Sequence, residues 1–504
     1  MGVLSGKKIL IFQQRGWAIS IGRFLARRLQ ADGCRLAAVT SKKLTHQYTV
    51  SQKEVAYDHI LNIDEILDGP EKNLAGEDIS LEEICCELNI DSIWPMLHSN
   101  RFLVRSYKDK YYYGYRQNVS DEHMVSYIKA YYKRLSDLFR DFKPDLILVS
   151  AFISEEQLML KLLADKYKIP VVAVMDAKVP GYYVFAHDHL CRQSPLIDRF
   201  HELQNNKSRS PNLAKAKNFI SEFRREFKKP VYASEEEEKT LLKKIRHHLS
   251  PLRRIIDFYT KPKVRANHLK SIGPTIDYRP PGIILRDFWC HKKYAKFADN
   301  YKYYHLEKIE KGVFFPLKFT PEGNIDLMCP LYNNQIELAR QVAMSLPGDY
   351  TLVAKDHWAM LGLRTPSYLE KVAKTPNVKL IDYRISAEEV LKKVDLIIST
   401  YSTVFFEAAF FYKPVVMLGA SGIFELLPNV FRHDNLYTLS AKIKEVLKIN
   451  LRTEQYERQL ENFVAAVYDT GFDYNYMAAW ERSLGSREEL WQIYKKEIER
   501  SLLQ

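Results

Sequence analysis

Residues 399–419 read STYSTVFFEAAFFYKPVVMLG and directly follow the apolar run VDLII. Their spacing predicts the end of a buried strand, a tight polar turn, a short helix rich in phenylalanine and a second strand. A strand–helix–strand unit of this kind places its two strands in parallel in one sheet. Because ligands of parallel sheets gather at the carboxyl ends of the strands, we expect the hydroxyl-rich turn to hold a ligand.

Similar short apolar runs recur on both sides of this unit and alternate with segments of helical periodicity. Strands are predicted at residues 7–12, 34–40, 145–150, 170–176, 313–319, 350–356, 378–382, 395–400 and 414–419. They define one α/β domain at 1–194 and a second at 311–450, with a helical insertion and connector at 195–310 and a helical tail at 451–504. The predicted fold class is therefore α/β with the GT-B architecture, in which two Rossmann-like parallel-sheet domains face a cleft.

The length and composition of the chain agree with two soluble domains. With 504 residues it is too long for one ordinary core, and its 46% hydrophobic and 27% charged residues are typical of globular proteins. The formal net charge of +13 calls for an anionic partner. A nucleic acid, an anionic membrane surface and a phosphorylated substrate all qualify, and charge alone does not choose among them.

Several functional classes are disfavoured because their patterns are missing. No apolar stretch approaches the roughly 20 residues that cross a bilayer, and the first residues lack the order of a signal peptide, so we expect a cytoplasmic protein. The six cysteines form no CxxC pair and are expected to be reduced. No HExxH, P-loop or GxGxxG pattern occurs, so we expect no metal, no cofactor and neither ATP hydrolysis nor dinucleotide redox chemistry.

The turn itself carries four hydroxyl side chains where a strand ends and a helix begins: Ser399, Thr400, Ser402 and Thr403. Free backbone N–H groups and the helix dipole make such a junction an anion site, and hydroxyls add hydrogen bonds to phosphate oxygens. Plain capping of the helix by Ser402 or Thr403 is the alternative, and it is compatible with phosphate binding.

Glu407 lies one helical turn after Thr403 on the same face and is surrounded by apolar residues. A carboxylate in such surroundings is costly unless it is paired. Two ribose hydroxyls would satisfy it as donors, which suggests a nucleotide ligand. A salt bridge to a nearby lysine such as Lys413 is the alternative.

Further polar residues follow neighbouring strands of the second domain. Lys355 and His357 end the strand at 350–356 and are expected to face the same crevice as the turn, where they can neutralise charge on a departing nucleotide. Lys318 and Glu322 follow the strand at 313–317 and are predicted to line the floor of the cleft.

The acceptor side is expected to come from the first domain. Its first strand-to-helix loop, which is predicted to face the cleft, contains Gln13, Gln14, Arg15, Gly16 and Trp17. Asp176, Glu155 and Glu156 follow strands, and each is a candidate general base, with Asp176 ranked first. Strand-end acids also cap helices, which is the alternative role. Lys178 and Tyr182 are expected to shape the same loop.

A resemblance adds to this interpretation. The runs VFFPLKFTPEG (313–323), AKDHWAMLGLRTPSYLEKVAKTPNVKLID (354–382) and VDLIISTYSTVFFEAAFFYKPVVMLG (394–419) resemble the bacterial capsule polysaccharide biosynthesis family, which includes transferases that use CMP-Kdo. The chain departs from the family pattern at Asp356, Trp358 and Tyr412. The resemblance implies that His357 and the Ser402–Thr403 turn contact the nucleotide phosphate and that Glu407 contacts the ribose. It makes CMP-Kdo the first expected donor, before UDP- and GDP-sugars.

Two segments, 101–117 and 223–263, interleave basic and aromatic residues. A solvated helical face and a peripheral contact with an anionic membrane both fit this pattern, and the membrane would bring a lipid-linked glycan acceptor within reach. Single-stranded nucleic acid uses similar surfaces, but a nucleic-acid partner is not expected.

The sequence therefore predicts a metal-independent glycosyltransferase that moves a sugar from a nucleotide sugar to a surface polysaccharide or a lipid-linked glycan. A CDP-glycerol-type glycerophosphotransferase is a near alternative, although Thr400 replaces the aspartate of that family's turn. A nonhydrolysing sugar-nucleotide epimerase shares the fold and is a second alternative. A non-catalytic basic protein that binds polysaccharide or nucleic acid is a third.

Overall fold

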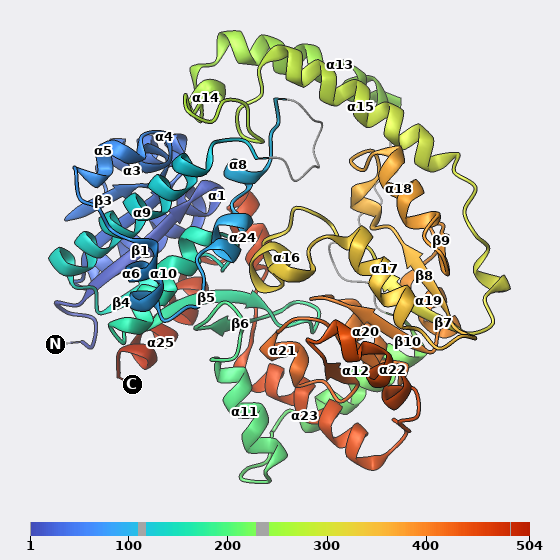
Figure 1. Cartoon of the computed structure of the whole chain (residues 1–504). Coiled ribbons are helices and arrows are strands. Elements are labelled where there is room, and N and C mark those ends of the chain that lie inside the picture. Colours follow the sequence, from blue (N-terminus) through green and yellow to red (C-terminus); the bar gives the residue numbers. More distant parts are fainter. Residues whose placement is uncertain (1, 109–116, 228–240, 484, 504) are drawn as a thin grey trace.

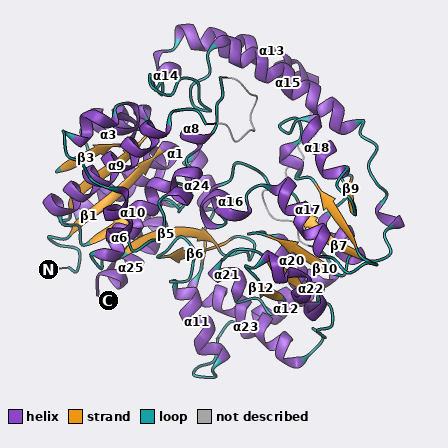
Figure 2. Ribbon diagram, viewed as in Figure 1, coloured by secondary structure: helices purple, strands orange, loops and turns teal. Residues whose placement is uncertain are grey.

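Two mostly parallel sheets organise the computed structural model, which describes residues 2–108, 117–227, 241–483 and 485–503 (Figures 1 and 2). The sheets share one strand order, apart from the additional edge strand β13 of the first. The first sheet has the order β13-β6-β5-β4-β1-β2-β3 and the second has the order β12-β11-β10-β7-β8-β9. In both, the chain starts in the middle, builds outward on one side and then crosses to the other, as in doubly wound nucleotide-binding folds. The predicted fold class is confirmed.

The first domain contains both antiparallel pairings, because β6 runs against β5 and β13 runs against β6. Its strands are β1 (Lys8–Gln14), β2 (Arg35–Ser41), β3 (His59–Asn62), β4 (Leu146–Leu148), β5 (Val171–Asp176), β6 (Tyr182–Ala186) and β13 (Phe472–Asp473). Its helices are α1 (Arg15–Trp17), α2 (Arg23–Ala31), α3 (Lys43–Ser51), α4 (Ile63–Asp68), α5 (Pro70–Leu74), α6 (Leu81–Leu88), α7 (Trp94–Ser99), α8 (Arg101–Val104), α9 (Asp121–Phe142), α10 (Glu155–Lys166), α24 (Tyr476–Arg482) and α25 (Arg487–Leu503).

The second domain is parallel throughout. Its strands are β7 (Gly312–Pro316), β8 (Thr351–Lys355), β9 (Val378–Ile381), β10 (Leu396–Ser399), β11 (Val415–Met417) and β12 (Val430–Arg432). Its helices are α16 (Gly323–Met328), α17 (Gln335–Ser345), α18 (Pro366–Ala373), α19 (Ala387–Lys393), α20 (Val404–Phe410), α21 (Gly422–Glu425), α22 (Leu439–Val446) and α23 (Glu454–Thr470). The opening stretch of the sequence analysis is thus β10, a turn, α20 and β11, with β10 and β11 paired in parallel.

The phenylalanines of α20 belong to an aromatic core. Phe405, Phe406 and Phe410 are buried, and the ring of Phe410 stacks on that of Phe223 with centroids 4.0 Å apart. Phe223 comes from α12 (Leu213–Arg225), which packs with α11 (Pro195–Gln204) and α23 on this side of the second sheet. The helical segment between the two domains therefore divides, because α11 and α12 join the second domain's core.

The remaining helices of that segment form a bridge between the domains, residues 250–299, which is drawn at the top of Figure 1. It contains the later part of α13 (Leu241–Thr260), α14 (Pro262–Arg265) and α15 (Pro281–Asp299). Its Asp277 pairs with Arg15 of the first domain at 2.8 Å. At the other end α15 contacts α18 of the second domain.

The helical tail also divides between the domains. After α23 the chain returns to the first sheet as β13, and α24 and α25 pack against that sheet. There the indole Nε1 of Trp17 donates to the hydroxyl of Tyr476 at 2.8 Å, and this hydroxyl lies 2.9 Å from that of Tyr494. No sequence pattern indicates this return.

Direct contacts also hold the two domains together along the cleft. The buried Asp326 of α16 has its Oδ2 atom 3.4 Å from the guanidinium of Arg105 in the first domain. A Cβ atom at Gly323 would lie 2.7 Å from the carbonyl oxygen of Ile153, so only glycine allows this approach. Among the described residues, no helix has both the length and the apolar character that crossing a membrane takes.

The packing of the tail yields a first prediction. Replacing the fully buried Leu490 of α25 with alanine leaves a cavity under the first sheet, so we expect the free energy of unfolding to fall by about 2–5 kcal/mol in urea denaturation. Leu503, in the same helix but 74% exposed, serves as the control, and its replacement by alanine should change the value by less than about 0.5 kcal/mol. Equal effects at the two positions would contradict this packing.

Candidate functional site

The candidate site lies at the point where the strand order of the second sheet reverses, between β7 and β10. Ligands of doubly wound sheets bind at this point, beyond the carboxyl ends of the strands. Lys318 follows β7, Lys355 ends β8, and the hydroxyl turn follows β10. The structure therefore brings together residues that are separated by up to about ninety positions in the sequence, as the sequence analysis predicts.

Glu407 supplies a buried carboxylate to this edge. Its side chain, on α20, is nearly inaccessible, and its Oε2 atom has no hydrogen-bond partner. Burial raises the pKa of Glu407 to about 7, against the lowering effect of Lys355 and then Lys318. An unsatisfied carboxylate oxygen in the interior is costly unless a ligand supplies the donors.

Two lysine ammonium groups, of the buried Lys318 and the partly buried Lys355, lower the pKa of this carboxyl group. Burial lowers the pKa of Lys318 to about 7, while Glu322, Cys329 and Glu407 raise it. Burial also lowers the pKa of Lys355, and Glu407 is the acid that opposes the shift most. The alternative of a Glu407–Lys413 salt bridge is not seen among the ion pairs of the described residues.

His357 presents a hydrogen-bond donor. Its Nδ1 atom accepts the backbone N–H of Ala359 at 3.1 Å, and burial together with Lys318, Lys355 and Arg364 lowers its pKa to about 4. The ring is therefore neutral at physiological pH, and its proton must be on Nε2 because Nδ1 is an acceptor. A neutral Nε2–H donor fits a phosphate oxygen, whereas the cationic form does not persist here.

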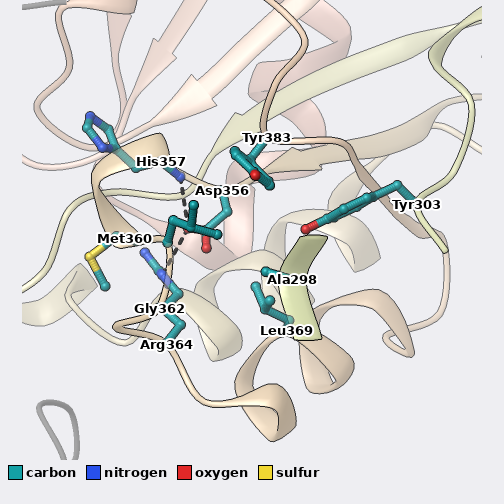
Figure 3. A pocket seen from close by; sticks show the side chains of 10 residues that line it. Ala298, Tyr303, Asp356, His357, Met360, Gly362, Arg364, Leu369 and Tyr383 are labelled. Atoms are coloured by element: carbon teal, nitrogen blue, oxygen red, sulfur yellow. Dashed lines mark hydrogen bonds and ion pairs between the residues drawn. The ribbon is translucent and has the colours of Figure 1, made fainter. Parts of the chain in front are cut away.

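The loop that carries His357 is fixed by a buried ion pair that is shown in Figure 3. The Nε atom of Arg364 lies 2.9 Å from Asp356 Oδ1, and the same carboxylate oxygen accepts the backbone N–H of His357 at 2.8 Å. Arg364 also donates to the carbonyl oxygen of Lys318. In Figure 3 the imidazole of His357 points away from Tyr303, on the far side of this pair.

The hydroxyl turn lies beside these groups. Ser399, Thr400 and Ser402 are buried, and Ser402 Oγ accepts the N–H of Val404 at 3.3 Å. Thr403 is partly exposed and its side chain makes no capping hydrogen bond. Capping by Ser402 is therefore present, and the phosphate role remains a prediction.

The first domain reaches this turn through Lys178. Its Nζ atom lies 5.3 Å from the centre of the Tyr401 ring and 3.6 Å from Asp176 Oδ2. Asp176 Oδ1 accepts the backbone N–H of Lys178 at 2.7 Å, and 45% of its side chain is exposed. Asp176 is thus an accessible carboxylate close to the second domain.

Glu155, another candidate general base, is less accessible than Asp176. Its side chain is buried, and Asn100 Nδ2 donates to it. Burial and then the charge of Glu156 raise the pKa of Glu155 well above its ordinary value. The carboxyl group is therefore enclosed by the protein in this conformation and is not accessible to an acceptor hydroxyl.

The first strand-to-helix loop is only partly at the cleft. Arg15 and Gly16 are exposed, whereas Gln14 is buried and its Oε1 atom accepts from Gln157 Nε2 at 3.2 Å. The expectation that Trp17 faces the cleft is wrong, because its indole is fully buried and bonded to Tyr476. Trp17 ends α1, and its ring packs inward because Tyr476 of α24 covers it.

The sequence analysis did not name three residues of the site and of the contact between the domains: Arg364, Asn100 and Asp326. Arg364 lies within the run 354–382 that carries the resemblance, which is the signal that could have found it. No local pattern marks Asn100 or Asp326, whose partners are distant in sequence. Among the described residues there is no cluster of three or more metal-binding side chains.

Known proteins were compared with this chain. No protein-family model and no curated protein matches it. Similar solved structures include the β-Kdo 2,7 transferase KpsC of Thermosulfurimonas dismutans, 14% identical over 66% of this chain and 80% of its own, with a TM-score of 0.34. The S. aureus MnaA structure with UDP is 14% identical over 97% of both chains, with a TM-score of 0.25.

A third similar structure is the UDP-GlcNAc 2-epimerase of Methanocaldococcus jannaschii in complex with UDP-GlcNAc and UDP. It is 12% identical over 90% of this chain and 97% of its own, with a TM-score of 0.24. A Kdo transferase and a sugar-nucleotide epimerase, two classes considered in the sequence analysis, are thus represented. At such TM-scores the comparisons decide nothing about this chain, and its fold class rests on its own strand order.

The buried carboxylate yields a pH prediction. The folded protein holds the proton of Glu407 up to about pH 7, whereas the unfolded chain loses it near its ordinary pKa of 4.5. This contribution to stability is complete below pH 4.5 and is lost as the pH rises to about 7. Relative to Glu407→Gln, the wild-type free energy of unfolding should fall by about 1.4 kcal/mol per pH unit inside this window.

Urea denaturation of both proteins between pH 4 and pH 8 measures this difference. The variant Ser402→Ala, which changes no titratable group in the same turn, should differ from wild type by one constant amount across the range. A Glu407→Gln difference that is equally constant would show that the carboxyl group titrates normally.

Proposed function

We propose that this chain is a glycosyltransferase that takes its sugar from a nucleotide sugar held by the second domain. One observation carries the proposal most directly. A nearly inaccessible carboxylate with an unpartnered oxygen shares the carboxyl edge of a doubly wound sheet with one buried lysine, one partly buried lysine and a neutral histidine. This set matches the parts of a nucleotide, because the hydroxyls of a ribose are donors and its phosphate is an anion.

In the proposed complex each group has a separate task. The carboxylate of Glu407 accepts hydrogen bonds from the ribose hydroxyls and thereby satisfies its Oε2 atom. His357 donates its Nε2–H to a phosphate oxygen, and Lys318 and Lys355 compensate the phosphate charge. The Ser402–Thr403 turn adds hydroxyl donors at the same place.

The transfer step follows from this arrangement. The bond between the anomeric carbon of the sugar and a phosphate oxygen breaks, and the electron pair leaves with the nucleotide. The two lysines and His357 stabilise the charge that develops on that oxygen, in the manner of an oxyanion site. A hydroxyl oxygen of the acceptor then bonds to the anomeric carbon and loses its proton.

Asp176 is the proposed base for that proton. It is partly exposed and lies beside Lys178, which contacts Tyr401 of the second domain. Glu155 is less suited because its side chain is buried and accepts a hydrogen bond from Asn100. Arg15 and Gly16 are exposed on the same domain and are proposed to contact the acceptor glycan. CMP-Kdo is the donor that the sequence resemblance favours.

The proposal predicts nucleotide binding. Titration calorimetry of the wild-type protein with CMP, UDP and GDP should detect binding of at least one of them. Glu407→Gln should weaken that binding by about 10- to 100-fold, because a hydrogen bond to a charged group contributes about 1.5–3 kcal/mol. Glu388→Gln, on the neighbouring α19 and paired with Lys392, is the matched control and should bind like wild type.

Absence of binding by the wild-type protein to all three nucleotides would overturn the proposal. Incubation with a nucleotide sugar in the absence of an acceptor separates the transferase from an epimerase. An epimerase would convert the nucleotide sugar under these conditions, whereas the proposed transferase needs the acceptor.

A further inference from the structure

We propose that α13 of the bridge docks the protein onto an anionic membrane surface through an apolar stripe formed by Leu252, Ile256 and Tyr259. This inference goes beyond the proposed function and does not depend on it. It rests on three observations: which side of α13 the bridge uses internally, what the other side exposes, and which charges flank it.

The inner side of α13 faces α15 within the bridge. Ser250, Pro251 and Arg254 line a cavity of about 460 Å³ together with residues of α15 such as Ile284 and Phe288. Phe258 of α13 is buried on the same side. The inward positions 250, 251, 254 and 258 follow the spacing of one helical face.

The outer side of α13 is apolar and open. Leu252, Ile256 and Tyr259 are 58%, 60% and 65% exposed. Their spacing of four and three residues places them in one row, and at about 100° per residue this row lies opposite the inward face. Large apolar side chains that are exposed in a row, and not singly, mark a surface that binds a partner.

The flanking charges are mainly positive. Between residues 250 and 265 the basic residues outside the inner side of α13 are Arg253, Lys261, Lys263 and Arg265, and the acidic residue is Asp257. Asp257 is neutralised by Lys261, whose Nζ atom lies 2.7 Å from its carboxylate. An apolar row with basic neighbours is the pattern of helices that lie in the interface of anionic membranes.

The neighbouring helix of the bridge has a similar composition. On α15, Leu285 and Trp289 are also exposed and lie one helical turn apart. Residues 109–116 and 228–240, which belong to the two basic and aromatic segments of the sequence analysis, lie outside the described residues.

The apolar row favours a membrane over a nucleic acid. A nucleic acid would use the arginines and lysines and could stack a base on Tyr259, but aliphatic side chains such as Leu252 and Ile256 add nothing to phosphate or base contacts. In a membrane these side chains enter the boundary of the acyl chains while the basic residues meet the lipid phosphates.

Sedimentation with vesicles tests the inference on the full chain. We expect the wild-type protein to pellet with vesicles of phosphatidylglycerol and phosphatidylethanolamine and to stay in solution with vesicles of phosphatidylcholine alone. The variant Leu252→Ser/Ile256→Ser/Tyr259→Ser should bind the anionic vesicles at least about tenfold more weakly. The control Met344→Ser/Tyr437→Ser/Leu503→Ser removes three exposed apolar residues elsewhere, 64%, 100% and 74% exposed, and should bind like wild type.

Thermal melting of each variant shows that it is folded, and because the stripe is exposed the melting temperature should stay unchanged. Equal binding by wild type and the stripe variant would overturn the inference. So would a wild-type protein that ignores anionic vesicles, including one that binds single-stranded RNA instead or forms dimers that the stripe variant abolishes.

Discussion

The arrangement of the second domain depends on the burial of a carboxylate and an ammonium group, with a second ammonium group partly buried, at one edge of a parallel sheet. Charged groups leave water at a high cost, and here the cost is limited by mutual attraction and by shifts in proton affinity. Glu407 holds its proton more tightly and Lys318 more weakly than in water. Such a cluster is stable only if its surroundings are rigid, and the aromatic packing of α20 against Phe223 supplies this rigidity.

The cost of burying charged groups also explains why the loop that follows β8 is held by an ion pair. Arg364 reaches under the loop to Asp356 and to the backbone of Lys318, so it connects the ends of β7 and β8. The imidazole of His357 is held by the N–H of Ala359 and needs no acidic partner. Donors and cations are therefore positioned before any ligand arrives, which reduces the cost of reorganisation on binding.

The predicted strands are found where hydrophobic runs are continuous and buried on both faces. β3, β6, β12 and β13 were missed because they are short, partly exposed or at an edge, and two of them pair antiparallel. At the site, Lys318, Lys355, His357 and Glu407 were predictable because strand ends and helix faces define directions. Trp17 and Glu155 were misplaced because their surroundings come from distant segments, Tyr476 for the first and Asn100 for the second.

The return of the chain to the first sheet through β13 makes the second domain an insertion in topological terms. The polypeptide leaves the first domain after β6, comes back after α23, and is joined to it again by the bridge. A body attached at several places cannot pivot freely in all directions. Any rotation of one domain against the other is therefore constrained by these crossings, beside which Gly422 packs closely on the backbone of Cys191.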